Sequence, residues 1–405
     1  MNIPFSPPFV DQDVIDEVVN TLETGWITTG PKVKALEIET AKLVEVNNVL
    51  CVNSATSALM LILHWYGIGS GDEVIVPAYT YSATALAVMH VGAIPIMVDI
   101  ENDFNISVQK IKAAITSRTK AIMPVDIAGW PCNYNEINSL VNDSEIKKLF
   151  TPKGVNQENL GRILVLSDAA HSIGAKYYGK QSGTLTDISV FSYHAVKNVT
   201  TAEGGAICLN LPEPFDNAEV YKTLRLWSLN GQTKDAYTKT QAGGWRYDIV
   251  YPGFKINMPD VCAAIGLAQI KKYTQQLLVE RRRVFEAYNK LFSEKDWAIL
   301  PPFETEYIKS SYHLYALRIN SITESERDGM MYEIAKTGVS VNVHFIPMPM
   351  LSVFKNMGYD IKEYPNSYAN YSREISLPIY PQLTQEQIEF IVLSTEQAFK
   401  QIKIF

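Results

Sequence analysis

One lysine, Lys197, occupies a position in the sequence where an amine could take part in chemistry. Residues 188–191 form a short apolar run that predicts a strand, and the Ser, His and Gly residues that follow are typical of a loop. We therefore expect Lys197 where a strand meets a loop. A lysine can form a Schiff base with an aldehyde once desolvation or a cationic neighbour lowers its pKa, but most lysines are hydrated surface charges. Taken alone, Lys197 favours the surface charge.

An acid upstream of this lysine changes that interpretation. The run 162–166 is largely apolar and leads to Asp168, the pattern of a buried parallel strand that delivers a carboxylate to the carboxyl edge of a sheet. Pyridoxal 5'-phosphate (PLP) needs both groups, a lysine for its aldehyde and an acid for its pyridinium nitrogen. Lys197 and Asp168 together therefore predict a PLP site.

The residues around these two groups carry a family resemblance. The segment from Ser192 to Gly205, with Asp168-Ala169-Ala170-His171, resembles the DegT/DnrJ/EryC1/StrS aminotransferases, which transfer an amino group from glutamate or glutamine to nucleotide-linked keto-sugars. The similarity runs from Ile3 to the C-terminal helix. It implies an aspartate-aminotransferase-like α/β fold (PLP-dependent transferase fold type I) and a homodimer with active sites at its interface.

Apolar runs and helical patterns alternate along the first half of the chain. This alternation predicts a mostly parallel sheet with helices on both faces. No GxGxxG segment occurs in the first turn between a strand and a helix, which argues against a nicotinamide-binding Rossmann domain and so against an oxidoreductase. The predicted strands are 49–52, 74–77, 94–98, 121–125, 163–166 and 188–191, and the predicted helices between them are 58–66, 83–90 and 108–115.

The last third of the chain predicts a smaller unit. A helical pattern at 259–291 leads to strands at 312–319 and 339–345 with a helix at 323–337 between them, and the stretch 232–251 is expected to be an extended loop. Thr323 with Glu326 has the spacing of a capping box, which Thr384 and Gln387 repeat before the last helix. With the family resemblance, these patterns give a large PLP-binding domain at 1–270 and a small C-terminal α+β domain at 271–405.

The first predicted turn offers an anion site. Thr56 and Ser57 open a helix whose free N–H groups, with the two hydroxyls, suit a cofactor phosphate, although Ser54 could simply cap the helix. Beside Lys197 and Asp168 the phosphate role becomes the better interpretation, and Ser192 would add a further hydroxyl. At the end of the strand 74–77, Tyr81 is the candidate for stacking on the cofactor ring, with Tyr79 as the fallback.

Other candidates rest mainly on the resemblance. His171 could hydrogen-bond the ring hydroxyl of the cofactor or orient Asp168. Lys255 and Asn257 stand where relatives carry Asn and Arg, in a segment that supplies phosphate contacts to the partner's site, so either could have that role. The substrate-pocket candidates are Trp26, His194 and His344, each of which could instead be a structural loop or strand residue.

Composition excludes several classes of protein. The formal net charge is -7, which gives no basic surface for nucleic acid. The four cysteines lack CxxC spacing, so they are expected to be free thiols of a cytoplasmic protein rather than disulfides or metal ligands. No apolar run approaches the roughly 20 residues that span a membrane, and no signal peptide is evident.

The resemblance also ranks the possible reactions. Ser192, His194, Thr200 and Glu203 match the pattern of enzymes that aminate C4 of the sugar, which favours a 4-keto-6-deoxy sugar over a C3 substrate. Sugar 3-dehydratases of the same fold have His in place of the lysine, so Lys197 argues against that activity, and a non-catalytic regulator would need an added DNA-binding segment. The product would serve lipopolysaccharide (O-antigen), capsule, glycoprotein or antibiotic glycosylation.

Overall fold

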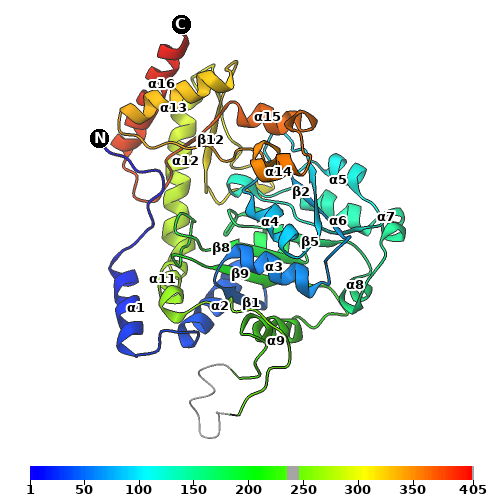
Figure 1. Ribbon diagram of the computed structural model, residues 1–405. Coiled ribbons are helices and arrows are strands. Elements are labelled where there is room, and N and C mark those ends of the chain that lie inside the picture. The colour runs from blue at the N-terminus through cyan, green and yellow to red at the C-terminus, as the bar shows by residue number, and fades with distance from the viewer. Residues whose placement is uncertain (235–245, 404–405) are drawn as a thin grey trace.

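A computed structural model describes residues 1–234 and 246–403, so part of the loop expected at 232–251 lies outside the described residues. A seven-stranded sheet with the order β1-β9-β8-β5-β4-β2-β3 forms the centre of the molecule (Figure 1). All its neighbouring pairs are parallel except the two that involve β9. The strands are β1 (Asn48–Val52), β2 (Glu73–Pro77), β3 (Ile94–Val98), β4 (Thr119–Ile122), β5 (Leu164–Asp168), β8 (Ile188–Ser192) and β9 (Gly205–Leu209).

The alternation of side chains along the strands puts an apolar core on each face of this sheet. In β9, Ile207 and Leu209 join one buried cluster while Ala206 and Cys208 join another. Strand β1 divides in the same way, because successive side chains of a strand point to opposite faces. The helices that pack on these faces are α2 (Pro31–Val44), α3 (Ala55–Trp65), α4 (Ala83–His90), α5 (Val108–Ala114), α6 (Tyr134–Asn142), α9 (Asn217–Ser228) and α11 (Asp260–Ile270).

The structure confirms the α/β class and all six strands predicted in the first half of the chain. It adds β9, which the sequence did not predict. This strand returns antiparallel between β1 and β8, directly after the loop that carries Lys197. Its position leaves β1 and β8 pointing the same way, so their carboxyl ends share one edge with those of β5, β4 and β2. Residues 144–160 form two short helices, α7 (Ser144–Leu149) and α8 (Val155–Leu160).

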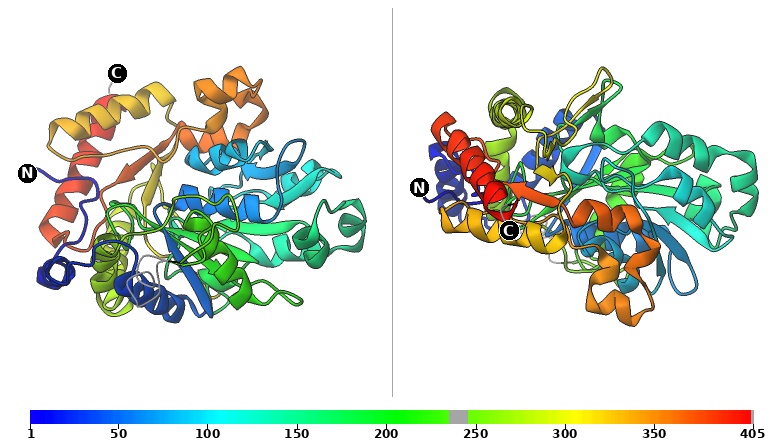
Figure 2. Two further views of the ribbon diagram at one scale, coloured as in Figure 1. Left: turned by 60° about the horizontal axis from the view of Figure 1, so that its bottom comes forward. Right: turned by 90° about the horizontal axis from the view of Figure 1, so that it is seen from above.

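The C-terminal elements gather at one end of the molecule, where both chain termini also lie (Figure 2). A second apolar core forms there around α12 (Leu278–Phe292), and it includes Ile3 from the N-terminus. The boundary expected at 270/271 remains a prediction. The elements at this end are β10 (Ala298–Ile299), β12 (Tyr315–Ile319), α13 (Glu324–Lys336), α14 (Ser352–Asn356), α15 (Pro365–Tyr371), β13 (Glu374–Leu377) and α16 (Gln385–Lys403). Helix α1 (Gln12–Glu23) packs against α11 instead, and β6 (Lys176–Tyr177), β7 (Lys180–Gln181) and β11 (Ile308–Lys309) form a small separate sheet.

Two predictions for this end were wrong. The segment 339–345 is not a strand, because only Val339 and Asn342 form single bridges, to Ile3 and Ser376. The helical pattern 259–291 is divided into α11 and α12 by a π-helical turn at Tyr273–Leu277. The capping box of Thr323 and Glu326 is confirmed, and no helix of the described residues is long and apolar enough to cross a membrane.

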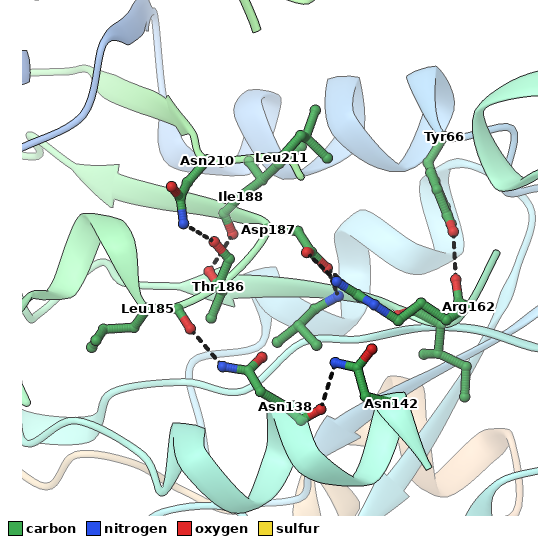
Figure 3. Close-up of polar contacts among 12 residues, drawn as sticks. Tyr66, Asn138, Asn142, Arg162, Leu185, Thr186, Asp187, Ile188, Asn210 and Leu211 are labelled. Atoms are coloured by element: carbon green, nitrogen blue, oxygen red, sulfur yellow. Dashed lines mark hydrogen bonds and ion pairs between the residues drawn. The ribbon is translucent and has the colours of Figure 1, made fainter. Parts of the chain in front are cut away.

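A buried ion pair joins β5 and β8 at the edge opposite their carboxyl ends (Figure 3). Arg162 donates from its two terminal nitrogens to the two carboxylate oxygens of Asp187, at 2.8 and 2.7 Å. The same carboxylate accepts the Val165 N–H at 2.9 Å, and Tyr66 donates its hydroxyl to the Arg162 carbonyl at 2.7 Å. These bonds fix the starts of the two strands whose other ends carry Asp168 and Ser192.

Replacing Asp187 with alanine is expected to destabilise the fold by about 3–5 kcal/mol, because it leaves the Arg162 guanidinium buried without its partner. Both side chains are at most 12% exposed, so water would compensate little. Chemical denaturation of the two proteins measures the difference. Glu145→Ala breaks a fully exposed pair with Lys148 and should change nothing measurable; an equal loss in both variants would contradict the prediction.

Candidate active site

A cavity of about 470 Å³ lies at the carboxyl edge of the sheet, between its strand ends and the C-terminal elements. Ligands of α/β proteins bind at this edge, where loops from several strands converge. The predicted residues that line the cavity are Thr56, Tyr81, Asp168, His171, Ser192, His194, Lys197 and His344, joined by Phe5, Ser6, His313 and Phe345 among others. The volume is within the range of small-molecule sites.

Lys197 enters the cavity from the turn that follows β8. Its backbone N–H donates to the His194 carbonyl at 2.9 Å, which closes the turn. The next residue, Asn198, is buried and donates to the Tyr273 hydroxyl at 3.1 Å and to the Ser311 carbonyl at 2.7 Å. Burial lowers the pKa of Lys197 to about 8, against the opposing effect of the Asp168 carboxylate. The amine is thus brought toward the unprotonated form that attacks an aldehyde.

Asp168 is the last residue of β5 and is buried. Thr84, in the first turn of α4, donates its hydroxyl to Oδ2 at 2.8 Å, and the Ala170 N–H donates to Oδ1 at 3.3 Å. Burial raises the pKa of Asp168, while these two hydrogen bonds and the charge of Lys197 act in the opposite direction. A carboxylate held in this way is suited to bind a cationic N–H group.

One end of the cavity is formed by the N-terminus of α3. Ser54 accepts the Ser57 N–H at 3.1 Å as N-cap and donates to the Ser57 hydroxyl at 2.9 Å. Thr56 lines the cavity, but Ser57 does not. Gly205 lies so close that a Cβ there would sit 2.6 Å from the Ala55 nitrogen, so the first turn packs directly on the backbone of β9. A helix N-terminus is suited to bind an anion.

Three neutral histidines border the cavity. Burial lowers the pKa of His171 and of His313 well below the ordinary value, and lowers that of His344 to about 3. His171 accepts the Ala128 N–H on Nδ1 at 3.3 Å, so its proton is on Nε2. The His171 and His313 rings lie 4.4 Å apart between centroids. A neutral ring whose proton position is fixed, as in His171, can direct a hydrogen bond to a ligand.

The other lining residues vary in exposure. Tyr81 is 62% exposed, and its ring centroid lies 5.9 Å from that of Phe345, whereas the fallback Tyr79 is buried and donates its hydroxyl to the His344 carbonyl at 2.6 Å. Ser192 accepts the His194 N–H at 3.3 Å. His194 itself lies 3.6 Å from the Glu203 carboxylate at the open side of the cavity. Of the two tyrosines, only Tyr81 is available to a bound ring.

Three other predicted residues do not line the cavity of the single chain. Trp26 donates its indole N–H to the Thr29 carbonyl at 3.3 Å, and Asn257 donates its amide to the Thr29 hydroxyl at 2.6 Å. Lys255 forms a bridge with Leu229. None of the three faces the cavity of its own chain.

Sequence reasoning missed Thr84, His313 and Glu374. Thr84 carries a hydroxyl in the first turn of a helix that follows a strand. This is the same sequence pattern that identified Thr56. His313 precedes β12 and donates from Nδ1 to the Asn198 amide oxygen at 2.9 Å, a contact between residues 115 positions apart that spacing cannot reveal. Glu374 is a charged residue in a strand that is buried throughout, which is itself an indication of a special environment.

A partly buried lysine in the turn after β8 and a buried carboxylate at the end of the neighbouring strand β5 define a PLP-dependent enzyme of fold type I. The groups present fit that cofactor, since a cavity of suitable size holds an amine, a carboxylate and a helix N-terminus. The chain belongs to the DegT/DnrJ/EryC1/StrS aminotransferase family, whose family model matches residues 8–150 and 157–395. PLP is therefore its cofactor. The six residues 151–156, which interrupt the match, span the end of the connection between α7 and α8 and the first two residues of α8.

Individual relatives agree over nearly the whole chain. A structure described as "Putative sugar aminotransferase Spr1654 from Streptococcus pneumoniae, PMP-form" is 42% identical, with a TM-score of 0.95 over 99% of this chain and 100% of that one. The Helicobacter pylori aminotransferase PseC, involved in the biosynthesis of pseudoaminic acid, is 26% identical with a TM-score of 0.85 over 99% and 100%. The spore coat polysaccharide biosynthesis protein SpsC of Bacillus subtilis is 34% identical over 98% of this chain and 97% of its own.

Proposed function

We propose that this aminotransferase moves an amino group from L-glutamate or glutamine to a nucleotide-linked keto-sugar, at C4 of a 4-keto-6-deoxy sugar (EC 2.6.1.-). The observation that carries the proposal is the cavity in which Lys197, Asp168 and the α3 N-terminus lie together. The relatives support the substrate class, since two are described as sugar or pseudoaminic acid enzymes and a third as a polysaccharide biosynthesis protein. Polysaccharide or glycoconjugate synthesis, such as that of O-antigen, is the pathway we infer.

When bound, PLP supplies an aldehyde that takes up the amino group and a ring that accepts electrons while a proton is lost. Lys197 would hold the cofactor through Nζ, and once displaced by the amino donor it would take the proton from one carbon and return it to another. Asp168 would keep the proton on the pyridine nitrogen. The α3 N-terminus, with Thr56, Ser57 and Ser192, would hold the phosphate.

The remaining residues would shape the two sides of the site. Tyr81 would stack on the ring, and the Nε2–H of His171 would donate to the ring hydroxyl side. His194 and His344 would contact the sugar, with Trp26 near the mouth. We further propose a homodimer in which Lys255 or Asn257 reaches the phosphate bound in the neighbouring subunit, which accounts for their distance from the cavity of their own chain.

The protein is proposed to act in the cytoplasm, where its four cysteines would remain reduced. All four are free thiols, with Cys51, Cys132 and Cys208 buried and Cys262 partly exposed. Among the residues described, no group of three or more His, Cys, Asp or Glu side chains is arranged to hold a metal ion.

The proposed substrate is tested in two stages. Absorbance of the PLP-loaded protein is recorded on addition of L-glutamate or L-glutamine, and the amino form is then mixed with 4-keto-6-deoxy and 3-keto sugar nucleotides. We expect conversion by one of the two amino donors, followed by recovery of the original spectrum and a 4-amino product identified by NMR. A 3-amino product would establish the C3 alternative, and loss of a sugar hydroxyl without amination would establish a dehydratase.

Replacing Thr84 with valine is expected to weaken PLP binding about tenfold or more. The substitution keeps the shape of a fully buried side chain but removes its hydrogen bond to the Asp168 carboxylate, and bonds to charged groups contribute roughly 1.5–3 kcal/mol. Titration of the apoprotein with PLP, followed by absorbance, gives the dissociation constant. Thr84→Ser restores the hydroxyl and should restore most of the affinity; equal affinity of the valine variant and wild type would refute the role of Thr84.

A further inference from the structure

Behind one wall of the cavity, a chain of hydrogen bonds leads from His344 to a buried acid. Nδ1 of His344 lies 2.9 Å from the Ser376 hydroxyl, which in turn lies 2.5 Å from Oε1 of Glu374. Oε2 of the same carboxyl accepts the backbone N–H of His344 at 3.0 Å. Glu374 and Ser376 are both 0% exposed, and neither lines the cavity. His344 does, stacked 5.3 Å from the ring of Phe5.

Which group donates and which accepts in each of these hydrogen bonds depends on whether Glu374 carries a proton. If Glu374 is ionised, it can only accept, so the Ser376 hydroxyl donates to it and the serine oxygen accepts a proton held on Nδ1 of His344. If Glu374 is protonated, it can donate to Ser376, whose hydroxyl then donates to Nδ1. In the first case Nε2 of His344 is a bare acceptor, and in the second it carries the proton and is a donor.

We propose that Glu374 is a positioning residue that acts through Ser376 to set which nitrogen of His344 carries the proton, and so whether His344 donates to an oxygen of the bound sugar. The inference that the ligand is a sugar rests on the proposed function. The coupling between Glu374 and the His344 tautomer does not, because it follows from the three side chains alone. His344 stays neutral throughout, since its own pKa is lowered to about 3.

The surroundings of Glu374 determine the pH at which its carboxyl loses its proton. Burial raises its pKa to about 8, against the hydrogen bonds from Ser376 and His344 and the charges of Arg327 and Arg318. Arg327, on α13, donates to the Glu374 carbonyl at 2.9 Å, and Arg318 lies on the neighbouring strand β12. Tyr79 also faces the carboxyl, and its pKa is raised by burial and by Glu374. Below pH 8, then, Nε2 of His344 is the donor.

The test compares wild type with Glu374→Gln in the PLP-loaded enzyme. A glutamine amide donates to Ser376 and accepts from the His344 N–H, so it reproduces the protonated acid at every pH. Protein labelled with ¹⁵N-histidine reports the tautomer by NMR, with His344→Gln used to assign the signal. We expect the His344 proton to move from Nε2 to Nδ1 in wild type as the pH rises through about 8, and to stay on Nε2 in Glu374→Gln.

A wild-type tautomer that does not change with pH would overturn the proposal. So would a titration that persists in Glu374→Gln, because a group other than Glu374 would then be its source. Ser376→Ala removes the hydroxyl that links His344 to Glu374 and should likewise abolish the coupling between them. These results stand whether or not the ligand is a sugar.

Kinetics then address the ligand. In wild type, the KM for the keto-sugar should rise roughly tenfold above pH 8 as Nε2 changes from donor to acceptor, the size of effect expected when a ligand oxygen loses its hydrogen bond. The Glu374→Gln enzyme should show no such rise, and the glutamate half-reaction should be the same in both proteins. A tautomer change without this KM difference would refute the contact with the sugar while leaving the coupling intact.

Discussion

Replacing Lys197 with alanine is expected to abolish amino-group transfer, lowering the rate by roughly 10⁴-fold or more. The side chain would act twice, as the amine that holds the cofactor and as the base that moves the proton, and positioned bases alone contribute roughly 10²–10⁴-fold. The visible absorbance of the bound cofactor and its conversion by glutamate measure both roles. Lys222→Ala removes an exposed surface amine and should leave both unchanged.

The pH dependence of PLP capture provides a second measurement on the same side chain. Only the unprotonated amine attacks an aldehyde, so capture should accelerate as the pH rises to about 8 and then level off. At pH 7, about one amine in ten is unprotonated when the pKa is 8, compared with roughly one in three thousand for an ordinary lysine. Capture that keeps accelerating up to pH 10 would show that the cavity does not lower the pKa of Lys197.

Replacing Asp168 with alanine is expected to lower kcat by roughly 10²–10³-fold while the cofactor remains attached through Lys197. The buried carboxylate would hold a proton on the pyridine nitrogen, and removing one preorganised charged partner from a site of this kind typically costs that much. Absorbance should still show bound PLP, whereas glutamate should convert it slowly. Full activity of the variant would refute the assignment.

A nearby acid provides the matched control for Asp168. Asp126 also lies buried at the carboxyl edge, but its oxygens bind the Tyr134 and Ser172 hydroxyls and the Cys132 N–H instead of facing the cavity. Asp126→Asn should therefore lower stability more than it lowers the rate of the glutamate half-reaction. If both variants lost activity equally, general disruption of the sheet edge would be the cause.

The sequence by itself determined the fold class and the two groups that define the cofactor. Strand positions follow from local runs of apolar residues, which record burial whatever the partner is, and all six strands predicted in the first half of the chain form. Asp168 could be identified because an acid at the end of an apolar run is unusual, and Lys197 could be identified only in combination with it. The helix cap of Thr323 could also be predicted, because its bonds with Glu326 span only three positions.

Only the tertiary structure decided how the cavity is completed. Thr84 reaches Asp168 across 84 positions and His313 reaches Asn198 across 115, contacts that local periodicity does not encode. The segment 339–345 has the composition of a strand but follows the cavity wall, because His344 is held by Glu374 and Ser376 instead of by a ladder of backbone bonds. Local pattern specifies which surfaces must be buried, and only the packed chain specifies which side chains then meet.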